Sequence, residues 1–196
     1  MASPKLKPFS FRRMERAVEK VRARLVRAAK ALEDAGIPYA IVGGNAVAAW
    51  IARVDAAAVR NTQDVDVLLR RRDLAAAAAA LESAGFVRRR AGPLEFFLDG
   101  PAASARDAVH VVYAGEKVRP ADCCPAPAVS ETVRNQAFRV IALGALVRMK
   151  LVAFRDKDRV HLRDLAAAGL VDARWCARLP KELAARLRRI LATPEG

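Results

Sequence analysis

Apolar positions recur at two different periods along the chain, and each period predicts its own kind of element. From Ser10, a residue type that caps helices, to Gly36 the spacing is three or four residues, which predicts one amphipathic helix. Its apolar stripe comprises Met14, Val18, Val21, Leu25, Ala28 and Leu32. We expect the stripe to face the core or a partner, and the strongly basic remainder to face solvent or an RNA backbone.

Short apolar runs between turn residues predict strands, whereas alanine-rich or periodic runs predict helices. The expected strands are 39–42, 67–69, 86–90, 94–98, 108–113 and 138–141, and the expected later helices are 46–54, 74–84, 144–154, 159–168 and 181–191. Segment 114–137 contains prolines and no clear period, so we expect a connector that packs over the domain. This order predicts an α/β (α+β) fold: a mixed sheet with helices on one face, plus an N-terminal helix and a C-terminal helical part.

The length of 196 residues suits one domain, or one core with a small appendage. We divide the chain into a basic N-terminal arm and helix (1–36), a core (37–141) and a C-terminal helical segment (142–196). The net charge of +14 favours a polyanionic partner, most simply nucleic acid. The arginine usage of a high-GC genome explains the same charge without such a partner.

Cysteine usage and hydropathy bear on the compartment. The three cysteines, Cys123, Cys124 and Cys176, form no metal-binding CxxC pattern, and the adjacent pair cannot easily bridge, which fits a reducing cytoplasm. No apolar run approaches the length of a membrane span, and the basic start lacks a signal-peptide core. We therefore expect a cytoplasmic protein with no membrane partner.

A glycine pair stands where the first predicted strand turns into a helix. Gly43 and Gly44 would let backbone N–H groups at the helix N-terminus approach a phosphate. Asn45 would add a side-chain amide for a phosphate oxygen. An ordinary strand–helix turn explains the glycines equally well.

Two aspartates, Asp64 and Asp66, follow farther along and lead into an apolar run. Side chains two positions apart share one face of a strand, so both carboxylates project together and repel unless a divalent cation neutralises them. Arg60 and Thr62 precede them and are candidates for holding phosphate, although Arg60 equally suits the surface. A phosphate cradle followed by this pair predicts phosphoryl or nucleotidyl transfer with Mg²⁺ or Mn²⁺, the alternative being two solvated aspartates at a strand end.

The two motifs together, GG-N at 43–45 and T-x-D-V-D at 62–66, resemble the minimal nucleotidyltransferase superfamily. The resemblance is greatest to bacterial nucleotidyltransferase-like proteins that include toxins of the abortive-infection type. Residues 150–165 resemble the helical segment that those proteins carry after the core. The resemblance implies that the aspartates bind magnesium, which bridges the phosphates of an NTP while an acceptor hydroxyl attacks the α-phosphate and pyrophosphate leaves.

The third carboxylate of this family is absent from its expected strand, where His110 stands instead. Several interpretations stay open. His110 acts as metal ligand or general base; Asp107, Glu95 or Asp99 supplies the carboxylate; the site binds without catalysing; or His110 is structural and bonded to a backbone carbonyl. As a ligand, histidine suits manganese or zinc better than magnesium.

The resemblance also assigns roles in the C-terminal block. It implies that Lys150 points toward nucleotide phosphates, while Asp158, His161 and Asp164 brace the helices against the core. The alternative is an ion-pair-laced helical surface. A break near 156–158 would divide the block into two helices.

These observations predict a metal-dependent nucleotidyltransferase acting on an NTP and a hydroxyl acceptor, with RNA favoured by the charge. The expected catalytic and metal-binding residues are Asp64, Asp66 and His110, and the expected nucleotide-binding residues are Gly43, Gly44, Asn45, Arg60, Thr62 and Lys150. One rival is a nucleotide- or nucleic-acid-binding protein without catalysis. The other is a small-molecule nucleotidyltransferase, which a deep acidic pocket would favour over a wide basic groove. The toxin analogy adds a cognate antitoxin as partner, and the oligomeric state stays open.

Overall fold

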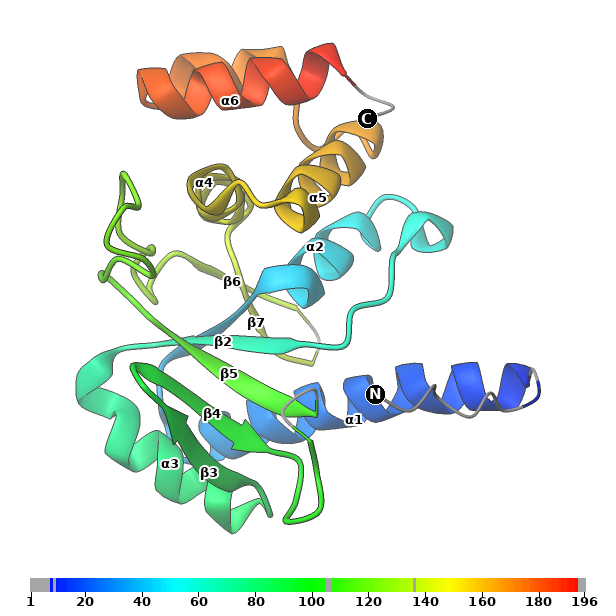
Figure 1. Cartoon of the computed structure of the whole chain (residues 1–196), viewed down its shortest axis with the longest axis vertical. Helices are drawn as coiled ribbons and strands as arrows, with labels where there is room; N and C mark the ends of the chain where they lie inside the picture. Colours follow the sequence, from blue (N-terminus) through cyan, green and yellow to red (C-terminus); the bar gives the residue numbers. More distant parts are fainter. Residues whose placement is uncertain (1–7, 9, 105–106, 136, 194–196) are drawn as a thin grey trace, which may run out of the picture.

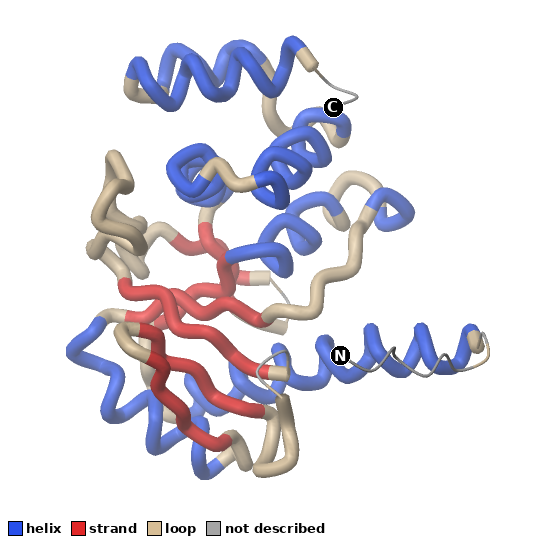
Figure 2. The backbone as a smooth tube through the Cα atoms, viewed as in Figure 1, coloured by secondary structure: helices blue, strands red, loops and turns tan. Residues whose placement is uncertain are grey.

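A seven-stranded mixed sheet forms the centre of the protein (Figures 1 and 2). The computed structural model describes residues 8, 10–104, 107–135 and 137–193, so most of the predicted N-terminal arm lies outside the described residues. The strands, in sheet order β3-β4-β5-β2-β1-β7-β6, are β3 (Val87–Ala91), β4 (Leu94–Leu98), β5 (Ala108–Tyr113), β2 (Val65–Leu69), β1 (Tyr39–Val42), β7 (Arg139–Ile141) and β6 (Thr132–Arg134). The predicted mixed sheet is confirmed.

The central strands β1, β2 and β5 fix the register of the sheet. β1 runs antiparallel to β2, and its last residue, Val42, lies beside Asp66. β2 runs parallel to β5 and sets Asp66 beside His110. The sheet therefore brings the end of β1, which the glycine pair follows, next to Asp66 and His110.

Helices cover both faces of this sheet, whereas we expected them on one face. Every residue of β1 is buried, so its side chains on both faces need apolar cover. One face packs against α1 (Phe11–Asp34) and α3 (Leu74–Ser83). On the other face α2 (Gly43–Ile51) lies next to the sheet, α4 (Leu143–Ala153) and α5 (Asp156–Ala167) pack over α2, and α6 (Lys181–Ala192) packs on α4 and α5, as Figure 1 shows. Short 3₁₀ helices occupy Ala56–Ala58, Arg71–Asp73 and Ala173–Arg178.

The predicted boundaries hold for most elements, with two informative differences. α2 begins at Gly43, ahead of the expected start at 46, so the glycine pair forms the first turn of the helix. The expected connector contains the edge strand β6, which we did not predict because a strand of three residues is too short to show a period. The rest of that connector lies over the domain as expected, where the Arg119 guanidinium donates a hydrogen bond to the Ala153 carbonyl at 2.8 Å.

Among the helices of the described residues, none has the length and apolar character that a membrane span requires.

Only the second half of α1 contributes to the core. Residues 11–20 are all exposed, and Figure 1 shows this half of the helix extending past the edge of the sheet. Leu25, Ala28 and Leu32 of the apolar stripe are buried, whereas Met14 is 65% exposed. The stripe is thus continuous in sequence but is covered along half its length.

This division can be tested by truncating two stripe residues. Leu25→Ala should lower the free energy of unfolding by about 2–5 kcal/mol, because it opens a cavity in the core. Met14→Ala should change it by less than about 0.5 kcal/mol, because the side chain lies outside the core. Chemical denaturation measures both values. Equal losses would mean that the first half of α1 is covered in solution.

Candidate active site

A cleft of about 640 Å³ lies against the sheet face that α2, α4 and α5 cover. Its lining includes Gly43, Gly44, Asp64, Asp66 and His110, which stem from both predicted motifs and from β5. Lys150 and Lys157 line it from the C-terminal helices, and residues of the connector close another side. A more open depression of about 890 Å³ lies at the opposite ends of the central strands, beside the start of β1 and the residues that follow β2 and β5, and contains none of the predicted site residues.

The two sequence motifs pack directly against each other. A Cβ atom at Gly43 would lie 1.9 Å from Asp66 Oδ2, and one at Gly44 would lie 2.7 Å from Thr62 Oγ1. The backbone of Gly43 also has a φ of +68°, a conformation that residues with a side chain rarely adopt. The glycines are needed because the aspartate segment occupies the space that their side chains would fill.

Asn45 also contacts the aspartate segment, and this contact differs from the role that we predicted for Asn45. We expected its amide to point at a phosphate oxygen. Its Nδ2 instead donates a hydrogen bond to the backbone carbonyl of Asp64 at 2.7 Å. Because the helix begins at Gly43, Asn45 falls in the first turn beside the aspartate loop and holds that loop in place.

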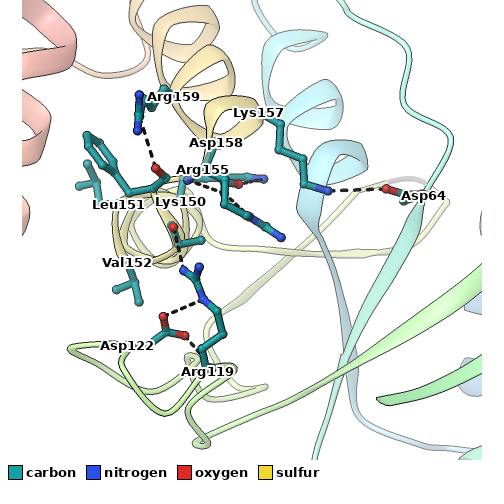
Figure 3. Close-up of polar contacts among 12 residues, drawn as sticks. Asp64, Arg119, Asp122, Lys150, Leu151, Val152, Arg155, Lys157, Asp158 and Arg159 are labelled. Atoms are coloured by element: carbon teal, nitrogen blue, oxygen red, sulfur yellow. Dashed lines mark hydrogen bonds and ion pairs between the residues drawn. The ribbon is translucent and has the colours of Figure 1, made fainter. Parts of the chain in front are cut away.

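Asp64 and Asp66 both reach the cleft, as their spacing predicted, but their surroundings differ. Asp66 lies within β2; burial raises the pKa of its carboxyl group, the charge of Asp64 raises it further, and His110, Lys150 and Lys157 oppose the shift. Asp64 precedes the strand, its side chain is 43% exposed, and Lys157 Nζ lies 3.7 Å from its Oδ2 (Figure 3). The pair therefore presents one accessible and one largely desolvated carboxylate.

Glu95, Asp99 and Asp107, the candidates for the third carboxylate, lie on the α1 face of the sheet, opposite the cleft. His110 pairs with Phe96, so the neighbouring residues Glu95 and Phe97 point to the α1 face, where Phe97 is part of the core. Glu95 is bonded there to Arg88. Strand alternation thus excludes Glu95 from the cleft.

Asp99 and Asp107 are excluded by their partners. Both accept hydrogen bonds from Arg24, a buried residue of α1, at 3.0 and 2.9 Å. The interpretation that Asp107, Glu95 or Asp99 supplies the third carboxylate is therefore wrong, and His110 remains as the side chain beside Asp66 on β5.

The donor set suits a cation that completes its coordination with substrate. Among the described residues, no group of three or more His, Cys, Asp and Glu side chains is arranged to hold a metal ion by itself. Mg²⁺ is commonly held by one or two carboxylates together with substrate phosphates and water. The raised pKa of Asp66, caused by burial and by Asp64, marks a pair whose charge a cation would relieve.

Lys150 lines the buried wall of the cleft with its ammonium paired to Asp158, whereas the resemblance implied that it points toward nucleotide phosphates. Its side chain is 6% exposed and donates a hydrogen bond to Asp158 Oδ1 at 3.0 Å. Burial lowers the pKa of Lys150, and the charge of Asp158 opposes that shift. Arg155 bonds the other carboxylate oxygen at 2.8 Å, so Asp158 ties the start of α5 to α4, whereas the resemblance implied that it braces these helices against the core (Figure 3).

The break between α4 and α5 gives Lys150 and Lys157 different surroundings: Lys150 is buried and Lys157 is accessible. Phe154 adopts a left-handed conformation with φ of 47°, slightly before the expected break. α5 then starts at Asp156 and directs Lys157 toward Asp64. Sequence reasoning missed Lys157, and its place within the predicted helix break at 156–158 was the available signal.

Two further predicted residues lie at the border of the site. Arg60 bonds Asp164 of α5 at 3.0 Å and is 69% exposed, so it fastens the segment before the aspartates to the C-terminal helices. His161 lines the cleft, and burial, aided by the charge of Lys150, lowers its pKa to about 4. Its imidazole is therefore neutral at neutral pH, and its buried Nδ1 has no hydrogen-bond partner among the described residues.

Gly43→Ala should disrupt the site, because its Cβ would displace the Asp66 carboxylate. Gly85→Ala is the matched control: Gly85 also has positive φ, but no atom lies within 4 Å of its Cβ position. The control should cost about 1–2 kcal/mol of unfolding free energy from backbone strain. We expect a larger loss for Gly43→Ala, measured by chemical denaturation; equal losses would refute the close approach.

Asp158→Ala should lower the free energy of unfolding by about 3–5 kcal/mol, because it leaves the Lys150 ammonium buried without its partner. Asp156→Ala, at a side chain that is 96% exposed, should have little effect. Urea unfolding of both variants makes the comparison. A small loss for Asp158→Ala would mean that solvent reaches Lys150.

The fold of this protein is similar to the folds of several solved structures. A putative nucleotidyltransferase from Helicobacter pylori shares 14% identity, with a TM-score of 0.53 over 92% of this chain and 79% of that one. A nucleotidyltransferase-like antigen of Paracoccidioides brasiliensis shares 16%, with a TM-score of 0.52 over 90% and 88%. The antibiotic-resistance factor ANT(2'')-Ia shares 16%, with a TM-score of 0.51 over 90% and 93%. At these identities the likeness establishes the fold.

Sequence comparison supplies the family itself. No curated protein matches the chain. A family model described as an uncharacterised nucleotidyltransferase matches residues 9–119, which is more than half of the 196 residues and includes both motifs and His110. The chain therefore belongs to this nucleotidyltransferase family.

Proposed function

We propose that the protein transfers a nucleoside monophosphate from an NTP to a hydroxyl acceptor, with Mg²⁺ or Mn²⁺ as cofactor. The supporting observation is the convergence of Asp64, Asp66 and Lys157 in one cleft beside the first turn of α2. A volume of about 640 Å³ suits a ligand of nucleotide size. Family membership supports the NTP as donor.

The roles of the side chains follow from their chemistry. Asp64 and Asp66 provide the oxygen ligands that Mg²⁺ prefers. The bound cation would polarise the α-phosphate and stabilise the charge that develops there. Gly43 and Gly44 offer backbone N–H groups at the positive end of α2. Lys157, a compact point charge on a flexible stem, exchanges Asp64 for the phosphates of the bound NTP.

His110 takes the position of the missing carboxylate in this proposal. Its place beside Asp66 in the sheet suits two roles: a nitrogen ligand for the cation, or a base that accepts the proton of the attacking hydroxyl. A ligand role predicts a weaker affinity for metal in His110→Ala. A base role predicts unchanged metal affinity and a lower rate.

RNA is the acceptor that we propose first, because the net charge of +14 suits a polyanion. A small-molecule hydroxyl is the second candidate, because a cleft of about 640 Å³ suits a ligand of limited size. Carboxylates and basic side chains both line the cleft, which is neither a wide basic groove nor a purely acidic pocket. A toxin role with a cognate antitoxin rests on resemblance alone; a neighbouring antitoxin gene would support it.

Titration calorimetry and pyrophosphate release test the proposal together. Each NTP is titrated with Mg²⁺ and then Mn²⁺ into the wild type, Asp64→Ala/Asp66→Ala, His110→Ala and the exposed control Asp156→Ala. We expect metal-dependent binding in the wild type and the control, and a loss of about 100-fold or more in the double variant, equivalent to roughly 2.7 kcal/mol. Chelation with EDTA should abolish binding in the same way.

Two outcomes would contradict the proposal at different levels. Binding without pyrophosphate release, with RNA and with small-molecule acceptors, would favour the non-catalytic rival. No binding of any NTP by the wild type would leave a nucleotidyltransferase fold used for another purpose.

A further inference from the structure

Arg24 is the most deeply buried arginine among the described residues, and it lies behind the site, on the α1 face of the sheet. Its side chain is 2% exposed. Nε donates to Asp99 Oδ2 at 3.0 Å, Nη2 to Asp107 Oδ1 at 2.9 Å, and Nη1 to the backbone carbonyl of Gln63 at 3.2 Å. The guanidinium thus bonds three separate segments from the centre of α1.

Two of these segments lead directly into the strands that carry the site. β2 and β5 pair in parallel, with Val65 beside Val109. Gln63 and Asp107 each stand two residues before that pair, so Arg24 joins equivalent positions where the two strands enter the sheet. Gln63 is also the residue before Asp64.

The carboxylate partners do not depend on Arg24 alone. Arg27 also bonds Asp99, and the Ser104 hydroxyl donates a hydrogen bond to Asp107 Oδ2 at 2.9 Å. The bond to the Gln63 carbonyl is different, because it restrains the peptide next to Asp64 and requires a rigid fork with several donors. Asn45 holds the Asp64 carbonyl from the other face, at 2.7 Å.

We propose that Arg24 is a positioning residue that fixes the Asp64 loop relative to the strand carrying His110. The inference rests on the proposed function, because the positioned groups are those assigned to metal and NTP. Arg24 contacts neither ligand in this scheme. It acts from the opposite face, through the peptide after Gln63 and through Asp107.

The experiment compares Arg24→Met and Arg24→Lys with the control Arg27→Met. Arg27 shares Asp99 with Arg24, but its side chain is 43% exposed and makes no bond to the Asp64 loop. Hydrogen–deuterium exchange reports on the backbone of residues 61–66, independently of activity. Pyrophosphate release from the NTP that the wild type binds, titrated with Mn²⁺, reports on the site.

We expect both Arg24 variants to exchange faster than the wild type and the control at 61–66. Their apparent Mn²⁺ affinity or kcat should fall roughly 10–100-fold, as when residues that orient metal ligands are removed. Arg24→Lys keeps the buried charge, so it retains a folded variant for the test if Arg24→Met fails to fold. The lysine ammonium cannot make the three hydrogen bonds of the Arg24 guanidinium, so Arg24→Lys should not restore the Mn²⁺ affinity or kcat.

Three results would overturn the inference or locate the failure elsewhere. Folded Arg24 variants that match Arg27→Met in exchange at 61–66 and in kinetics would refute positioning. A lower melting temperature without either local change would leave only a role in stability and would also refute it. A wild type that releases no pyrophosphate would refute the proposed function instead, while the exchange data would still decide whether Arg24 restrains the loop.

Discussion

The close approach of residues 43–45 to residues 62–66 is the constraint on which the site depends. Gly43 and Gly44 leave room for Asp66 and Thr62, and Asn45 bonds the peptide of Asp64. A side chain at either glycine would require the aspartate segment to move. The two motifs, distant in sequence, therefore form one contact that places both carboxylates beside the first turn of α2.

Buried charges lie on both faces of the sheet around this contact. Arg24 restrains the approach to β2 and β5 from below, and the Lys150–Asp158 pair fastens α4 to α5 above the cleft. Such groups are costly to desolvate, and apolar residues of similar size often stabilise a core as well. Apolar side chains, however, cannot direct a hydrogen bond to a chosen carbonyl or hold the Lys150 ammonium at Asp158, which leaves Lys157 as the lysine beside Asp64.

His110 defines how this protein departs from the pattern that it resembles. Alternation along β4 turns Glu95 to the α1 face, where Arg88 bonds it, and Arg24 holds Asp99 and Asp107 on the same face. The cleft therefore has the aspartate pair and an imidazole beside it. A cation bound there would depend more on phosphate oxygens than in a site with three carboxylates, which couples metal binding to NTP binding in the proposed reaction.

The sequence by itself determined the elements and the two motifs, because local periodicity and turn residues encode them. It predicted β1 and β5 to the residue, both carboxylates on one face, and the connector over the domain. It did not predict that Asn45 would hold a peptide, that Lys150 would be buried, or that Lys157 would meet Asp64. Those outcomes depend on shifts of two or three residues in where a helix starts or breaks, and on which segments pack together, so only the tertiary structure decided them.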